Sequence, residues 1–213
     1  MPEQDQTTNK YHAHNKTNMD VFIIGGFLGS GKTSLLMKLA SHFTEQKKRV
    51  ALLVNESGEV GVDGATLKAQ GYDSIELPSG CICCTLAGDL LHALRNIKND
   101  IDPDILMIEP TGLALPHKVK DMVRNAMIEE DKNEIIGIAD IQRFNDLITK
   151  KEEFFTRQMH AAEFIMINKA DVAKPGEIEA ATAWLQNRFP GRTVIPVSVK
   201  EGTNLDKVYE LME

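Results

Sequence analysis

Residues 25–34 read Gly25-Gly26-Phe27-Leu28-Gly29-Ser30-Gly31-Lys32-Thr33-Ser34. From Gly26 to Thr33 they spell G-x-x-x-x-G-K-T, the phosphate-binding loop pattern. The apolar run at 21–24 predicts a buried strand before the loop. The apolar residues after the loop recur at the spacing of one helix face: Leu35, Leu36, Leu39 and Phe43. The motif therefore stands between a strand and a helix, which is the context it requires.

The chemistry of such a loop is specific. Glycines let backbone N–H groups point at phosphate oxygens, and the following helix N-terminus adds its partial positive charge. Lys32 is expected to reach the β- and γ-phosphates, and the Thr33 hydroxyl to bind Mg²⁺. The alternative is a glycine-rich turn that binds nothing. We expect these residues to bind nucleotide: Gly26, Gly29, Ser30, Gly31, Lys32, Thr33 and Ser34.

Composition narrows the class of protein. The chain has 213 residues, 42% hydrophobic and 26% charged, with a net charge of −7. This acidic balance argues against a nucleic acid or an anionic membrane as an electrostatic partner. We find no apolar run long enough to cross a bilayer and no signal peptide pattern, so we expect a cytoplasmic protein.

The first 19 residues are polar and aperiodic, which predicts a disordered arm ahead of one domain at 20–213. The arm carries His12 and His14, which could capture a metal ion weakly, although a solvated tail is the simpler interpretation.

The rest of the chain alternates between strand and helix patterns. Short apolar runs predict further strands at 50–54, 74–77, 104–108, 135–139, 164–167 and 194–197. Helical patterns follow at 90–97, 116–127, 152–162 and 175–189, and a short one begins at 204. This alternation predicts the α/β class, as a P-loop NTPase three-layer αβα sandwich with a mainly parallel central sheet.

Two segments could respond to the γ-phosphate. Residues 55–63 are acidic and glycine-containing, and Glu56, Glu59 and Asp63 are candidate sensors of the phosphate and its Mg²⁺. A solvated surface loop is the alternative there. Glu109 directly follows the strand predicted at 104–108, at the position where a phosphate-hydrolysing enzyme holds Mg²⁺. Gly112 permits a close backbone approach to the γ-phosphate.

A second nucleotide signal follows the strand at 164–167. Asn168-Lys169-Ala170-Asp171 spells N-K-x-D, and the Asp171 carboxylate can accept hydrogen bonds from guanine N1–H and the N2 amine. Adenine lacks this donor pair, so the motif favours GTP over ATP. The later loop with Ser198 and Val199 can close over the base from the other side.

Three cysteines lie within four positions: Cys81, Cys83 and Cys84. Their spacing differs from the C-x-x-C pairs of a structural zinc finger. Thiolates favour Zn²⁺, Co²⁺, Ni²⁺ or Cu⁺ over Mg²⁺ or Ca²⁺, which suggests a transition-metal site. Buried thiols or a redox-sensing set are the alternatives.

Taken together, these motifs resemble the CobW-like family of metallochaperone GTPases, which is related to the nickel chaperones HypB and UreG. The resemblance covers about 21–211, and Gly80-Cys81-Ile82-Cys83-Cys84 is its most specific motif. It implies slow GTP hydrolysis, transition-metal binding by the cysteine motif and metal delivery to a client protein. Two departures are expected: Ser57 stands where the family usually has an aromatic residue, and the chain ends where we expect the GTPase domain to end, whereas most members continue into a C-terminal domain.

The resemblance also implies roles for individual residues. Lys32, Glu109 and Gly112 would be the catalytic group, and Thr33, Asp63 and Glu109 would hold Mg²⁺. The transition metal (Zn²⁺, Co²⁺ or Ni²⁺) would be bound by Cys81, Cys83, Cys84 and Glu59. Asn168, Lys169 and Asp171 would read guanine.

Three functional hypotheses follow. The first is a GTPase that drives metal delivery to a client metalloprotein or cobalamin-related enzyme, with a possible nucleotide-dependent homodimer. The second is a GTP-dependent regulatory or assembly factor for a corrinoid or metal cofactor enzyme, without metal transfer. The third is an ATP-using P-loop kinase, against which Asp171 argues.

Overall fold

The computed structural model describes residues 19–55, 73–77, 87–110 and 112–213. The predicted arm, including His12 and His14, lies outside the described residues. The first strand begins at Met19, which is fully buried, one residue before the expected start of the domain.

A seven-stranded sheet forms the centre of the described part of the chain, in the order β3-β2-β4-β1-β5-β6-β7, and each neighbouring pair is parallel. Its strands are β1 (Met19–Gly26), β2 (Val50–Asn55), β3 (Asp73–Leu77), β4 (Ile105–Glu109), β5 (Glu130–Asp140), β6 (Phe164–Asn168) and β7 (Thr193–Pro196). Strands buried on both faces carry near-continuous apolar runs, as β1 does at 21–24 and β6 at 164–167. The predicted mainly parallel sheet is confirmed.

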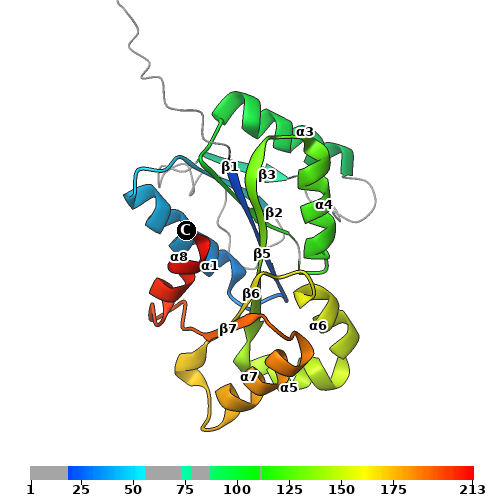
Figure 1. Ribbon diagram of the computed structural model, residues 1–213, viewed down its shortest axis with the longest axis vertical. Helices are drawn as coiled ribbons and strands as arrows, with labels where there is room; N and C mark the ends of the chain where they lie inside the picture. The colour runs from blue at the N-terminus through cyan, green and yellow to red at the C-terminus, as the bar shows by residue number, and fades with distance from the viewer. Residues whose placement is uncertain (1–18, 56–72, 78–86, 111) are drawn as a thin grey trace, which may run out of the picture.

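Helices cover both faces of the sheet (Figure 1). On one face lie α1 (Lys32–Glu45) and α8 (Leu205–Met212). On the other lie α3 (Ala87–Asn96), α4 (Pro116–Ala126), α5 (Ile141–Lys150), α6 (Glu152–Met159) and α7 (Glu177–Arg188). Short turns of other helix types follow α3 at Ile97–Ile101 and β6 at Ala170–Val172. The three-layer αβα arrangement is therefore confirmed.

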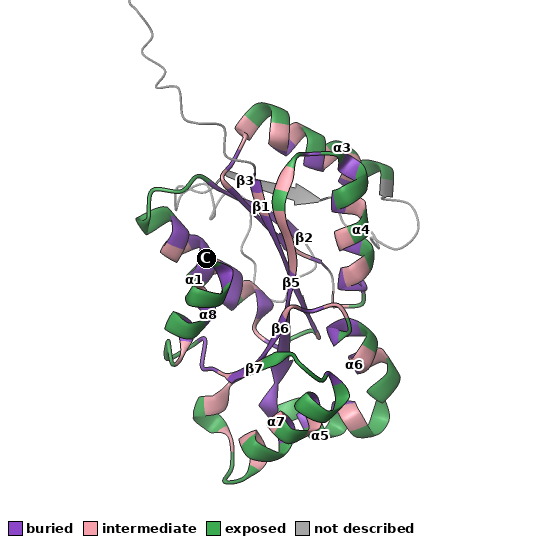
Figure 2. Cartoon of the chain, viewed as in Figure 1, coloured by how far each residue is buried: buried purple, intermediate pink, exposed green. Residues whose placement is uncertain are grey.

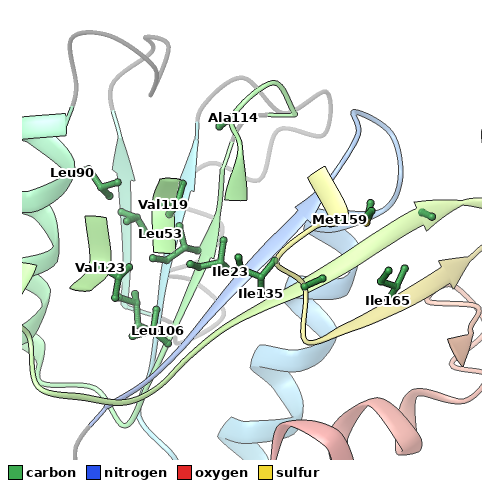
Figure 3. Close-up of a cluster of buried hydrophobic side chains, with 14 of the residues drawn as sticks. Ile23, Leu53, Leu90, Leu106, Ala114, Val119, Val123, Ile135, Met159 and Ile165 are labelled. Atoms are coloured by element: carbon green, nitrogen blue, oxygen red, sulfur yellow. The ribbon is translucent and has the colours of Figure 1, made fainter. Parts of the chain in front are cut away.

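Each face of the sheet contributes to its own hydrophobic core. Figure 2 shows the central strands buried between helices that expose their outer sides. In the larger core, strand residues such as Ile23, Leu106 and Ile135 meet Val123 of α4 and Met159 of α6 (Figure 3). Burial of this apolar surface is the main force that holds the layers together.

The structure differs from the sequence expectations in two places. Strand β5 begins at Glu130, five residues before the predicted start at 135, because its partly exposed first half continues the pairing with β1. Helix α5 was not predicted, although Ile141, Phe144 and Leu147 recur at helical spacing and are buried against the core. Asp140 marks the boundary between β5 and α5, because its side chain caps the helix, but in the sequence pattern it indicated only the end of the strand.

No helix in the described ranges is long and apolar enough to cross a membrane.

Candidate nucleotide and metal site

The parallel sheet brings the ends of its strands to one edge. Gly26 ends β1, Glu109 ends β4, Asp140 ends β5 and Asn168 ends β6. Because β1 lies between β4 and β5, the phosphate-binding loop after Gly26 has a strand-end carboxylate on either side. Ligands of open parallel sheets bind at this carboxyl edge.

The loop requires its glycines. Gly29 and Gly31 have φ of 75° and 99°, a left-handed conformation that side-chain-bearing residues rarely adopt. A Cβ at Gly31 would lie 2.4 Å from Asn168 Nδ2, so only glycine allows the β6 end to approach this closely. The loop is therefore shaped both by its backbone and by its neighbour strand.

Lys32, Thr33 and Glu109 form a compact charged group at the start of α1. Glu109 Oε1 accepts a hydrogen bond from Thr33 Oγ1 at 3.0 Å and lies 3.8 Å from Lys32 Nζ. Lys32 Nζ also donates to the Phe27 carbonyl at 3.2 Å. The side chains of Lys32 and Glu109 are only 5% and 13% exposed, so both charges are largely shielded from water.

Burial dominates the electrostatics of this group. It lowers the pKa of Lys32, against the opposing attraction of Glu109. It also raises the pKa of Glu109, against the effects of Lys32 and the Thr33 hydrogen bond. A hydroxyl and a carboxylate oxygen 3.0 Å apart suit Mg²⁺, a hard cation that takes oxygen ligands, so Thr33 and Glu109 fit the expected ion.

The turn after β4 lies against the phosphate-binding loop. A Cβ at Gly112 would lie 2.9 Å from the backbone nitrogen of Leu28, so this position also needs glycine. The buried Gln158 of α6 anchors the turn, since its Nε2 donates to the Ala114 carbonyl at 2.8 Å and to the Gly112 carbonyl at 3.4 Å. The anchoring role of Gln158 was missed, because nothing in the local sequence links residues 112 and 158.

Asn168 ties three loops together. Its Nδ2 donates to the Ser30 carbonyl at 2.8 Å, and its Oδ1 accepts from the Val199 backbone N–H at 3.0 Å. Asn168, Ser198 and Val199 are all buried. The structure thus joins the N-K-x-D motif to the phosphate-binding loop and to the loop after β7.

Lys169 and Asp171, unlike Asn168, are accessible to solvent. Lys169 has a φ of 65°, and its Nζ donates to Asp140 Oδ2 at 2.7 Å. Asp171 stands exposed in the turn Ala170–Val172, where its carboxylate is accessible to a ligand. The Asp140 partner was not predicted; its position at a strand end beside β1 was the available signal.

The predicted transition-metal ligands Cys81, Cys83, Cys84 and Glu59 lie outside the described residues, as does the predicted Mg²⁺ ligand Asp63. The candidate sensor Glu56 also lies outside them, as does Ser57, which differs from the family pattern. Within the ranges that are described, no cluster of three or more His, Cys, Asp and Glu residues could hold a metal ion.

Comparison with known proteins decides the family. The family model described as CobW/HypB/UreG, nucleotide-binding domain, matches residues 20–196. The chain belongs to the CobW/HypB/UreG family. The resemblance drawn from the cysteine and nucleotide motifs is thereby confirmed at the level of the family.

Relatives of this CobW/HypB/UreG member include the zinc chaperone YeiR of Escherichia coli, 36% identical over 81% of this chain and 53% of YeiR. The Zn(II)-bound GTPase YjiA of Escherichia coli is 27% identical in a solved structure with a TM-score of 0.61, covering 84% of this chain and 58% of that one. Hydrogenase maturation factor HypB from Archaeoglobus fulgidus shares the fold at 19% identity and a TM-score of 0.67, covering 92% and 91%. The chain spans about half the length of YeiR.

Proposed function

We propose that the chain is a cytoplasmic GTPase that couples its nucleotide state to a transition metal ion and delivers that ion to a client metalloprotein. The observation that carries the proposal is the Lys32–Thr33–Glu109 group, which shares one edge of the sheet with the N-K-x-D motif. Membership of the CobW/HypB/UreG family supports the link to metal.

The phosphate chemistry follows from the charged group. The ammonium of Lys32 is shielded from water and lies 3.8 Å from the Glu109 carboxylate, at the start of α1, where it can bind the β- and γ-phosphates of GTP. Thr33 and Glu109 would hold Mg²⁺, which neutralises charge that develops on the transferred phosphoryl group. Hydrolysis adds water to the γ-phosphorus and breaks its bond to the β–γ bridging oxygen, which yields GDP and phosphate.

The guanine base is assigned to the second motif. Asp171 is exposed and can accept from N1–H and the N2 amine of guanine. Asn168 holds this motif beside the phosphate-binding loop through the Ser30 carbonyl. Base and phosphates of one nucleotide can therefore contact both motifs at once.

The transition metal ion would be the cargo, bound by Cys81, Cys83 and Cys84 with Glu59. Zinc is the leading candidate, since YeiR is a zinc chaperone and the YjiA structure holds Zn(II). Cobalt and nickel suit thiolates as well, and a HypB structure from Helicobacter pylori contains nickel. GTP would bring the turn at 109–112 and residues 55–63, including Asp63, onto the γ-phosphate and would gather the thiolates. A nucleotide-dependent homodimer would form in the same state. Hydrolysis would reverse this change and release the ion.

The test is a metal titration of the reduced full chain, with Co²⁺ as a visible probe and Zn²⁺ as competitor. Titrations run in parallel with GDP·Mg²⁺ and with a non-hydrolysable GTP analogue. We expect thiolate-to-cobalt absorption whose affinity or stoichiometry depends on the nucleotide. Identical titrations in the two nucleotide states would contradict the coupling and favour a regulatory or assembly factor without metal transfer.

Two variants separate the parts of the mechanism. Cys83→Ala should abolish the thiolate-to-cobalt band and leave GDP binding intact. Lys32→Met should retain the band but make it indifferent to nucleotide, because the phosphate ligand is lost. A Cys83→Ala protein that keeps the full band would exclude the cysteine motif as the metal site.

A further inference from the structure

Asp140 is a buried carboxylate with two separate partners. It ends β5 and is 2% exposed. Its first partner is Lys169, whose Nζ donates to Asp140 Oδ2 at 2.7 Å. Its second partner is the backbone N–H of Gln142, which donates to Asp140 Oδ1 at 2.9 Å, so that Asp140 caps the N-terminus of α5. A carboxylate is buried only when it is paired in this way, so the site depends on both contacts.

The first partner places a side chain of the base-reading motif. Asp140 pairs in register with Asn168, the residue before Lys169. Strand β5 lies between β6 and β1, so the Lys169 side chain runs from the motif toward the strand that carries the phosphate-binding loop. A nucleotide that contacts Asp171 and Lys32 must cross this same interval. The aliphatic stem of Lys169, held at its far end by Asp140, then lies where it can cover the base.

The second partner leads to the phosphate-binding loop. Helix α5, which Asp140 caps, carries Arg143 in its first turn. Arg143 Nη1 donates to the Leu28 carbonyl at 2.8 Å, inside the phosphate-binding loop. One carboxylate therefore connects to both halves of the nucleotide site, in addition to the direct bond from Asn168 to Ser30.

We propose that Asp140 is a positioning residue for nucleotide binding: it fixes Lys169 over the base and, through α5 and Arg143, holds the phosphate-binding loop in place. Asp140 touches neither base nor phosphate itself and acts through Lys169 and Arg143. This inference rests on the proposed guanine nucleotide binding.

The substitution Asp140→Asn separates the two contacts. Asparagine keeps the size of the side chain and an oxygen that can cap α5. With that oxygen on the cap, its NH2 group faces Lys169; an NH2 group only donates, so it cannot accept a hydrogen bond from the ammonium, and the side chain carries no charge. Lys169→Met removes the same contact from the other side, at a residue that is 34% exposed and less important for folding.

The measurement is the dissociation rate of fluorescently labelled GDP with Mg²⁺ from the full chain, by stopped flow. We expect Asp140→Asn and Lys169→Met each to accelerate release about tenfold, as for loss of a charged hydrogen bond. The double variant should be no faster than either single variant, because both remove one contact. Asp146→Asn and Lys150→Met are matched controls, since they break an exposed pair at 2.9 Å on the same helix and should leave release unchanged.

A second readout distinguishes positioning from general disruption. Inosine diphosphate lacks the N2 amine that Asp171 is expected to bind, so the ratio of GDP to inosine diphosphate affinity reports on Asp171. Asp140→Asn should weaken both ligands by the same factor, because it acts on Lys169 and not on Asp171. A collapse of the ratio would show that the whole motif has lost its structure and would overturn the positioning role.

The remaining outcomes are also decisive. Additive acceleration in the double variant, or release at the wild-type rate from Asp140→Asn or Lys169→Met, would overturn the inference while leaving guanine nucleotide binding intact. A wild-type chain that does not bind labelled GDP would instead overturn the proposed function, and the inference with it.

Discussion

Single residues shape the candidate nucleotide site, and the glycine immediately before α1 shows this most directly. Gly31 combines a φ of 99° with a contact in which a Cβ would lie 2.4 Å from Asn168 Nδ2. A real Cβ essentially never comes this close to another atom, so either the loop or Asn168 must move.

We therefore predict that Gly31→Ala weakens GDP binding at least about a hundredfold, because it displaces the loop that cradles the phosphates. Isothermal titration measures the affinity. Gly176→Ala is the matched control, since Gly176 has a φ of 80° but nothing within 4 Å of its added Cβ. It should cost about 1 kcal/mol of stability and leave the GDP affinity unchanged. Equal affinity losses in both variants would rule out the Asn168 contact as the cause.

Asp171 is expected to determine base choice, because its carboxylate accepts two hydrogen bonds from guanine. Asp171→Asn presents an amide donor in place of one acceptor, which suits xanthine, whose C2 carbonyl replaces the amine. We expect GTP binding to weaken about a hundredfold or more and xanthosine triphosphate binding to improve. Competition against labelled GDP measures both. Asp206→Asn, at an exposed position on α8, is the control and should behave like wild type.

At the scale of elements, α6 packs against the phosphate-binding loop through aromatic contacts. Phe155 is fully buried, and its ring lies 6.1 Å from that of Phe27 in the loop. It also packs edge-on against Phe144 of α5 and Trp184 of α7. The same helix provides Gln158, which anchors the turn containing Gly112.

Phe155→Ala should lower the free energy of unfolding by about 3–5 kcal/mol, because it opens a cavity in the core. It should also weaken GDP binding by the folded protein, since Phe27 loses its support. Denaturant unfolding followed by Trp184 fluorescence and a GDP titration measure the two effects. Phe189→Ala, at a buried position at the end of α7, is the control. The Phe189→Ala variant should lose stability but keep its GDP affinity. A Phe155→Ala protein with normal GDP affinity would show that Phe155 does not support Phe27 in the phosphate-binding loop.

For the whole molecule, the proposed nucleotide would contact residues that follow strands in both halves of the sheet. The residues expected to bind the phosphates lie after β1 and at the end of β4, and the base-reading motif follows β6. A ligand that binds only the folded chain stabilises it, by about 2.7 kcal/mol at a hundredfold excess over Kd.

We therefore expect saturating GDP with Mg²⁺ to raise the Tm by about 5–10 °C, as measured by differential scanning fluorimetry. EDTA should reduce this shift if Thr33 and Glu109 hold Mg²⁺ beside the phosphates as proposed. ATP should give little or no shift, and Lys32→Ala should abolish the response to GDP. A shift with ATP as large as that with GDP would disprove the base assignment.

Local signals in the sequence were sufficient for most of the fold. Apolar runs and helical spacing predicted each described strand and most helices, because burial on both faces leaves a clear pattern in a parallel sheet. The exceptions were α5 and the first half of β5. Helix α5 begins directly after Asp140, the last residue of β5, so no loop marks its start. The first half of β5 is polar and partly exposed, so it leaves no clear apolar pattern.

The sequence by itself determined the phosphate-binding loop, the strand-end residues Glu109 and Asn168 and the family, because each of these depends on residues close together in the chain. Only the tertiary structure decided that β1 lies between β4 and β5. That order brings Glu109 to Thr33, Asp140 to Lys169 and Arg143 to Leu28, contacts that join residues 76, 29 and 115 positions apart. The physical reason is that hydrogen bonds act over a few ångströms in space, and strand order, which no local pattern encodes, sets those distances.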